Sequence, residues 1–94
     1  MPYNETFDIV AFRSRSHALK FCQILNQEGC AARIISTPKE IALGCGLSAR
    51  FEPYVTPRAI EIYKRFNLPI IGFYHIERMG SITNIKRIHH ESTF

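Results

Sequence analysis

The sequence predicts an α+β domain whose elements follow the order β-α-β-β-α-β. Short runs rich in β-branched and aromatic residues are typical of strands, and two longer segments carry apolar residues at helical spacing. Each helical segment ends at a residue that favours a left-handed backbone, Gly29 in one and Asn67 in the other. With 94 residues, of which 46% are apolar, the chain has the size and composition of one folded domain.

The first half of the chain predicts a strand, a helix and a second strand. Residues 7–12 are β-branched and aromatic between polar flanks, which favours a strand. A helix follows, with Ser14 or Ser16 as its N-cap and Gly29 as its stop. The apolar stripe of this helix consists of Ala18, Leu19, Phe21, Cys22, Ile24 and Leu25. Residues 32–35 are expected to form the next, short strand.

The second half of the chain predicts a strand, a helix and a closing strand. Residues 47–51 alternate apolar and polar side chains, which is the pattern of a half-buried strand. Thr56 and Pro57 are typical of a helix start, with the threonine as cap and the proline at the first helical position. Residues 70–76 are the most strand-like run of the chain, and we expect His75 within it to be a structural residue on one sheet face.

Two β-α-β halves of this kind usually build a four-stranded antiparallel sheet with both helices on one face, the ferredoxin-like arrangement. Each helix has a single apolar stripe, which fits one covered face. We assign residues 6–78 to this domain. Residues 79–94 contain a Gly-Ser break and only sparse isoleucines. Three interpretations of this segment stay open: a frayed tail, a short added strand or a helix. The two open edges of such a sheet would also permit a homodimer.

The segment from Thr37 to Leu47 is the strongest candidate for function. Its first residues predict a capped helical turn, because Thr37 can accept a hydrogen bond from the amide of Glu40, and Glu40 can reach back to the cap. Pro38 suits the first helical position, where a missing N–H costs nothing.

Cys45 follows this turn and stands between two glycines. Gly44 and Gly46 permit backbone angles that a side chain would forbid, so we expect Cys45 on a sharp, exposed turn as the working residue. Lys39, Arg33 and Arg50 are candidates to supply positive charge to its thiolate. The predicted helical turn has the opposite effect, because a helix C-terminus disfavours a nearby anion.

Composition and motifs exclude several classes of protein. The net charge of +4 hints at an anionic partner, although the basic residues are spread along the chain. No apolar run approaches the roughly 20 residues that span a bilayer, and the first residues lack the features of a secretory signal, so we expect a cytoplasmic protein. The three cysteines form no C-x-x-C pair, which argues against a disulfide scaffold and a structural zinc site. Phosphate loops and hydrolase motifs are also missing, and we expect neither metal nor cofactor.

The chain resembles a small family of selenium/sulfur carrier-like proteins over about residues 6–78. The similarity lies in four segments: Ser16-His17-Ala18-Leu19 after the first strand, Thr37-Pro38-Lys39-Glu40-Ile41, Cys45-Gly46-Leu47 running into Ala49-Arg50-Phe51, and Ile71-Gly72-Phe73-Tyr74-His75-Ile76. The spacing from the Thr-Pro-Lys-Glu segment to Cys-Gly is its most specific part. Gly44 and residues 79–94 depart from the commonest pattern of the family.

The resemblance implies a carrier in which the thiol of Cys45 holds sulfur or selenium as a persulfide or selenosulfide. Such a protein would exchange its cargo with donor and acceptor proteins, as a co-substrate more than as a stand-alone enzyme.

The residues alone leave two other functions open. One is a non-catalytic module whose sheet or basic tail binds a protein or, with less support, nucleic acid, for which Phe7 or Phe12 and Phe51 are the candidate stacking residues. The other is a thiol-redox protein in which Cys45 is oxidised against Cys30.

Overall fold

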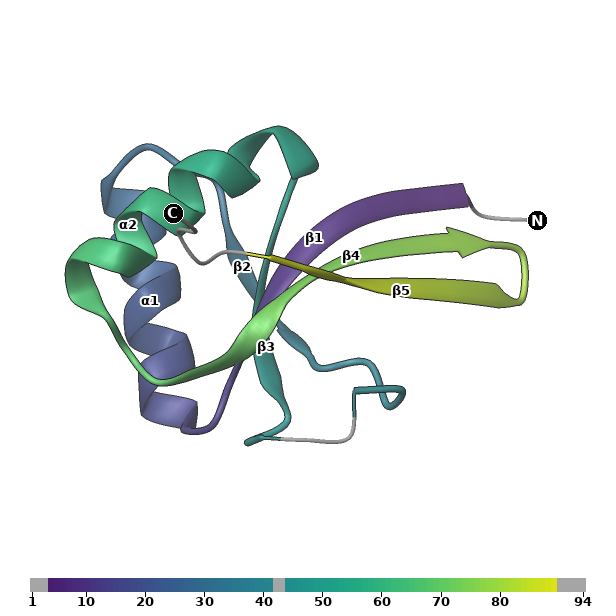
Figure 1. The fold of residues 1–94 in the computed structure, drawn as a ribbon, viewed down its shortest axis with the longest axis horizontal. Helices are drawn as coiled ribbons and strands as arrows, with labels where there is room; N and C mark the ends of the chain where they lie inside the picture. The colour runs from purple at the N-terminus through teal and green to yellow at the C-terminus, as the bar shows by residue number, and fades with distance from the viewer. Residues whose placement is uncertain (1–3, 42–43, 90–94) are drawn as a thin grey trace.

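The computed structural model of this chain describes residues 4–41 and 44–89, which form an α+β fold (Figure 1). The elements in chain order are β1 (Asn4–Phe12), α1 (Arg15–Gln27), β2 (Arg33–Ser36), β3 (Leu47–Phe51), the 3-10 turn η1 (Pro53–Val55), α2 (Thr56–Phe66), β4 (Ile70–Met79) and β5 (Ile82–Ile88). The strands make one antiparallel sheet in the order β2-β3-β1-β4-β5. Both helices contribute to the apolar core on the same face of this sheet.

The sheet has five strands where the sequence predicted four. β4 continues to Met79, and the two-residue turn of Gly80 and Ser81 leads directly into β5. Gly80 has a φ of 61°, which suits the first central position of a tight hairpin turn. The isoleucines of β5 lie three residues apart and so hide the period of two, but the long β4 provides a complete ladder for them.

The predicted helix stops are confirmed, and so is Ser14 as the N-cap residue of α1, whereas the cap predicted at Thr56 is wrong because Val55 is the N-cap of α2. At the end of α1, Gly29 has a φ of 85° and the amide of Cys30 donates to the carbonyl oxygen of Leu25 at 2.8 Å, as in a Schellman motif. Asn67 ends α2 with a φ of 51°. At the helix starts, neither Ser14 nor Thr56 makes a side-chain cap, because each hydroxyl has another partner, the hydroxyl of Ser16 and the carboxylate of Asp8, respectively.

The alternation of the strands produces two apolar clusters, one on each face of the sheet. The larger cluster lies between the sheet and the helices, and we call it the helix-side core. Its aromatic members are Phe12, Phe21, Phe51 and Phe73. The smaller cluster lies on the face that no described helix covers, and we call it the open-face core. Its members are Phe7, Ile9, Ala11, Ile41, Ile71, Tyr74 and Ile76.

Candidate functional site

The loop that carries Cys45 joins β2 to β3 and is closed at its base by two hydrogen bonds of Thr37. The amide of Thr37 donates to the carbonyl oxygen of Gly46 at 2.8 Å, and its hydroxyl lies 2.7 Å from the hydroxyl of Ser48. The first bond continues the β2-β3 ladder by one step beyond the pair Ser36–Leu47. The base of the loop is therefore held as firmly as the sheet itself.

The capped helical turn predicted at Thr37 is wrong for the described residues. Pro38 and Ile41 close a single turn, in which the amide of Ile41 donates to the carbonyl oxygen of Pro38 at 2.9 Å, and no helix is assigned between residues 37 and 41. The Thr37 hydroxyl engages Ser48 instead of capping toward Glu40. The remainder of the predicted turn, residues 42–43, lies outside the described residues. Residues 37–41 therefore form no helix whose C-terminal dipole would disfavour a thiolate at Cys45.

Gly44 and Cys45 lie against the C-terminal end of β1. The amide of Cys45 donates to the carbonyl oxygen of Phe12 at 2.9 Å. Gly44 has a φ of 90°, and a Cβ on it would lie 2.3 Å from that same oxygen and 3.0 Å from Cγ1 of Ile71. Only glycine permits both the backbone angle and this close approach. Gly46 also has a positive φ, 85°, but the space around it is open.

Cys45 is the most accessible of the three thiols. It is half-buried against the helix-side core, whereas Cys22 and Cys30 are each 7% exposed. The Cys45 thiol donates to the carbonyl oxygen of Leu47 at an Sγ–O distance of 3.8 Å. Burial raises the pKa of Cys22 above its ordinary value of 9.0, and the hydrogen bond from Asn26 opposes this only in part. Cys45 is therefore the least buried of the three cysteines.

The basic and acidic residues predicted around Cys45 do not converge on its sulfur. Lys39 and Glu40 are exposed on the single turn of the loop. Arg50 lies on the open face of the sheet, where it pairs with Glu5 at 3.1 Å and covers the ring of Phe7 at 3.8 Å. Among the described residues, no cation is recorded in contact with Sγ of Cys45.

A different source of positive potential lies near the loop, the N-terminus of α1. The Cys45 amide is bonded to Phe12, and the N-cap residue Ser14 follows two residues later. The first turn of α1 contains no acidic residue and has no side-chain cap. Figure 1 shows the start of α1 and the start of β3 at the same end of the molecule. The partial positive charge of a helix N-terminus therefore lies on the side of the molecule where Cys45 is placed.

Comparison with known families identifies this arrangement. Residues 8–75 match the family described as "Putative Se/S carrier protein-like". The chain belongs to this family. The match begins inside β1 and ends inside β4, so the carrier-like region includes the whole Cys45 loop, and β5 lies beyond it. No curated protein and no solved structure matches the chain.

Within the region matched by the family, Cys30 and Cys45 lie beyond opposite ends of the β2-β3 ladder. Cys30 precedes the pair Arg33–Arg50, and Cys45 precedes Leu47 at the other end. The ladder between these ends spans about 10 Å, whereas a disulfide requires Cα atoms within about 7 Å of each other. All three cysteines are free. The geometry therefore gives no support to a direct Cys30–Cys45 disulfide.

The aromatic residues considered for nucleic-acid stacking are all covered. Phe12 and Phe51 belong to the helix-side core and face the helices. Phe7 is on the open face but has no exposed surface, because Arg50 lies over its ring. None of these three rings offers a face on which a base could stack.

A polar network that the sequence did not predict crosses the domain away from Cys45. Asp8 is 3% exposed, and its carboxylate accepts a hydrogen bond from the hydroxyl of Thr56 and lies 2.6 Å from Nδ1 of His75. The other ring nitrogen of His75 is 3.7 Å from Glu77. This pairing agrees with the structural role expected for His75. An aspartate inside an apolar strand was the signal that could have revealed the network, since a buried carboxylate requires partners.

Two further features bear on the class of protein. In residues 4–41 and 44–89, no three His, Cys, Asp or Glu side chains gather into a group that could hold a metal ion. Neither α1 nor α2 has the length and apolar character needed to cross a bilayer.

Proposed function

We propose that this protein carries sulfur or selenium, with Cys45 holding the cargo as a persulfide or selenosulfide. The observation that carries the proposal is the contrast between one accessible thiol, fixed on a glycine-flanked loop, and two buried ones. Membership of the Se/S carrier-like family supports it. We propose that the protein acts in the cytoplasm as a co-substrate of donor and acceptor proteins, and not as a stand-alone enzyme.

The transfer is a thiol exchange in two displacements. The Cys45 thiolate attacks the outer sulfur of a donor persulfide, a new S–S bond forms on Cys45, and the donor's S–S bond breaks to release the donor thiolate. The proton of the outer sulfur stays with the transferred atom. An acceptor thiolate then attacks the same outer atom and releases the Cys45 thiolate. No net oxidation occurs, and selenium in the outer position follows the same course.

The loop contributes position more than activation to this chemistry. The hydrogen bonds of Thr37 and Cys45 fix the base and the working end of the loop to β3 and β1. A thiol held in one place reacts with less loss of conformational freedom than one on a mobile segment.

We also propose that the region β1-α1-β2-β3-α2-β4 is a ferredoxin-like unit to which β5 adds a fifth strand. The strand order β2-β3-β1-β4 and the placement of both helices in one core support this assignment. In such a unit the Cys45 loop is the connection between the two middle elements of the chain, β2 and β3.

Mass spectrometry after incubation with a small-molecule persulfide donor tests the carrier proposal. We expect the wild-type protein to gain one sulfur atom on Cys45. The variants Cys22→Ala and Cys30→Ala serve as matched controls and should gain the same adduct, because both thiols are buried. The proposal is overturned if Cys45→Ser gains the adduct as readily as the wild type.

A further inference from the structure

We propose that the open face of the sheet is a docking surface for an acidic region of the donor or acceptor protein. Four arginines lie on this face, Arg33, Arg50, Arg78 and Arg87, as the strand pairings place them. The identity of the partner as a donor or acceptor rests on the proposed carrier function, whereas the charge of its surface does not.

Three of these arginines belong to one row that crosses the sheet. The paired residues are Arg33 with Arg50, Arg50 with Ile9, Ile9 with Tyr74, and Tyr74 with Arg87. Residues that are paired in this way point to the same face, so the row places three guanidinium groups on one surface. With strands about 4.8 Å apart, the row is about 19 Å long. We call this set, Arg33, Arg50 and Arg87, the arginine row.

The positive charge of the open face is only partly balanced. Glu5 pairs with Arg50 at 3.1 Å and lies 3.8 Å from Arg78. In the described part of the chain, no ion pair joins Arg33 or Arg87 to an acidic side chain, and Arg87 instead donates to the carbonyl oxygen of Ile71 at 3.2 Å. Two unpaired cations at the ends of the row leave this face complementary to an anionic partner.

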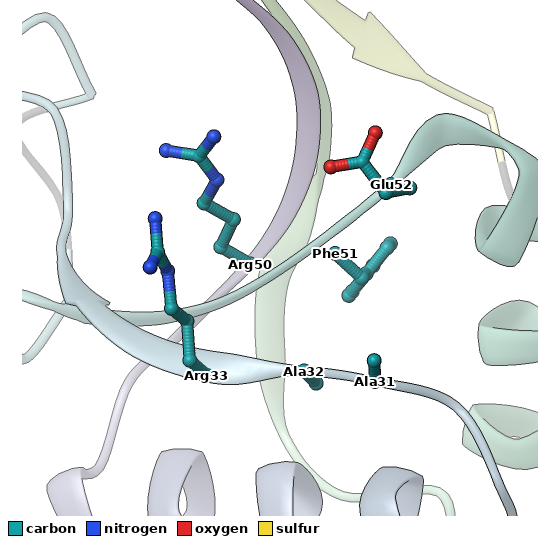
Figure 2. A pocket seen from close by; sticks show the side chains of 6 residues that line it. All are labelled: Ala31, Ala32, Arg33, Arg50, Phe51 and Glu52. Carbon is teal, nitrogen blue, oxygen red and sulfur yellow. The ribbon is translucent and has the colours of Figure 1, made fainter.

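An acidic side chain of the partner would bind most tightly between Arg33 and Arg50. Like charges directly opposite each other on neighbouring strands are destabilising. In Figure 2 the two side chains extend in the same direction beside a hollow of about 330 Å³. Glu52 lies across this hollow from them and makes no ion pair with either arginine within the described segments. A carboxylate placed between the two guanidinium groups would remove their repulsion and accept hydrogen bonds from both.

Acidic protein fits this face better than nucleic acid does. Single-stranded nucleic acid binds through aromatic side chains on which bases stack, in addition to positive charge. Both aromatic members of the open-face core are buried, Phe7 with no exposed surface and Tyr74 with 9%. The arginines lie over them, Arg50 above Phe7 and Arg87 at 5.9 Å from the centre of Tyr74. Within residues 4–41 and 44–89, the face therefore presents cations without an exposed ring on which a base could stack.

The arginine row also lies at a useful distance from the thiol. The pair Arg33–Arg50 is three steps, or about 10 Å, from the pair Ser36–Leu47 that begins the Cys45 loop. A protein docked on the row would thus extend naturally past the loop, where its own thiol could meet Cys45. The open face would then orient the partner while the loop takes part in the exchange.

Fluorescence anisotropy with a labelled poly-L-glutamate peptide tests the docking surface, in Cys45→Ser protein so that no thiol chemistry contributes. We expect salt-sensitive binding that weakens about tenfold in the double variant Arg33→Gln/Arg87→Gln. The matched control is Lys20→Gln/Lys86→Gln, which removes the same net charge from other surfaces and should change binding less than about twofold. Lys86 is next to Arg87 on β5, but it pairs with His75 and points to the helix side of the sheet.

Three outcomes would overturn the inference. They are the absence of poly-L-glutamate binding by Cys45→Ser protein with all its arginines and lysines intact, an equal loss in both double variants, and binding of an oligodeoxythymidylate of equal charge as tight as that of the peptide. Far-ultraviolet circular dichroism confirms that the exposed substitutions leave the fold intact. Because the assay contains no persulfide, its failure leaves the Cys45 carrier proposal standing, and the failure of sulfur loading leaves the docking surface standing.

Discussion

On one face of the sheet two helices cover the apolar side chains, whereas on the other face arginines and one loop residue cover them. Phe21 in the helix-side core and Phe7 in the open-face core are both without exposed surface. Phe21 packs against the ring of Phe12, at a centroid distance of 5.6 Å. Phe7 instead has Arg50 and Arg78 over it, at 3.8 and 5.3 Å.

This difference indicates that equal burial does not mean equal rigidity. Side chains enclosed between the helices and the sheet are held by close packing, and a cavity among them cannot easily be filled. Long arginine side chains bury their aliphatic stems and can follow a change in the surface below them. The open face also includes Ile41 of the Cys45 loop. The Cys45 loop thus contacts both cores, because Ile41 belongs to the open-face core and Cys45 packs against the helix-side core.

The largest effect that we predict compares one phenylalanine from each core. Phe21→Ala should lower the free energy of unfolding by about 4 kcal/mol, because it leaves a cavity between the helix and the sheet. Phe7→Ala should cost about 2–3 kcal/mol, since the arginine side chains can settle into part of the space. Urea denaturation followed by circular dichroism measures both. A loss for Phe7→Ala equal to that for Phe21→Ala would show that the open face is as rigid as the other.

The second prediction concerns the loop that joins the two faces. Gly44→Ala should destabilise the protein by about 2–4 kcal/mol, because a Cβ meets both a left-handed backbone angle and the carbonyl oxygen of Phe12. Gly46→Ala has the same kind of angle in open space and should cost only about 1 kcal/mol. Unfolding curves of the two variants, recorded side by side, measure the difference. Equal costs would mean that the contact of Gly44 with β1 does not hold the loop.

Much of this fold could be predicted from the sequence because its signals are local. The apolar stripe of α1, the left-handed stops at Gly29 and Asn67, and the alternation in residues 47–51 each depend on neighbours along the chain. β5 could not be assigned in this way. Its residues form a strand because the long β4 is available as a partner, which is a long-range condition that no local pattern in Ile82–Ile88 expresses.

For the candidate site, the sequence indicated the thiol but not its surroundings. Glycines on both sides of Cys45 predicted a special turn, and the backbone angles at Gly44 and Gly46 agree. The cap expected from Thr37 failed because Ser48, eleven residues later, competes for the same hydroxyl. Arg50 was expected near the sulfur, yet the strand period directs it to the open face toward Glu5. Contacts between distant segments decided both cases.

The third prediction tests how much the arginines contribute to burying the open-face core. Arg50→Ala should lower the free energy of unfolding by about 1–2 kcal/mol, since it removes a cation–π contact and an ion pair and exposes Phe7. Arg33→Ala on the neighbouring strand is the control. We expect its effect to be within about 0.5 kcal/mol of zero, because Arg33 covers none of the described rings and its removal relieves a like-charge pair. If Arg33→Ala also lowered the free energy of unfolding by about 1 kcal/mol or more, the loss would come from removing a positive charge and not from uncovering Phe7.

The smallest effect that we predict concerns Cys22, a buried thiol of the helix-side core. Burial raises its pKa above 9.0 in the folded protein, so the unfolded chain loses this proton at lower pH than the folded chain does. The folded state then binds more protons in that range, and the free energy of unfolding must fall as the pH rises from about 9 toward the raised value. Below this range the contribution is complete and constant.

Comparison of wild-type protein with Cys22→Ala isolates this contribution from those of the other titrating groups. The variant should be less stable at neutral pH because of the cavity, but its stability should fall less steeply above pH 9. The difference in slope should stay below about 1.4 kcal/mol per pH unit, which is the limit for one proton. Parallel slopes would mean that Cys22 reaches solvent in the folded protein. Cys22 and Cys45 would then no longer differ in accessibility, and the observation that singles out Cys45 as the carrier residue would be lost.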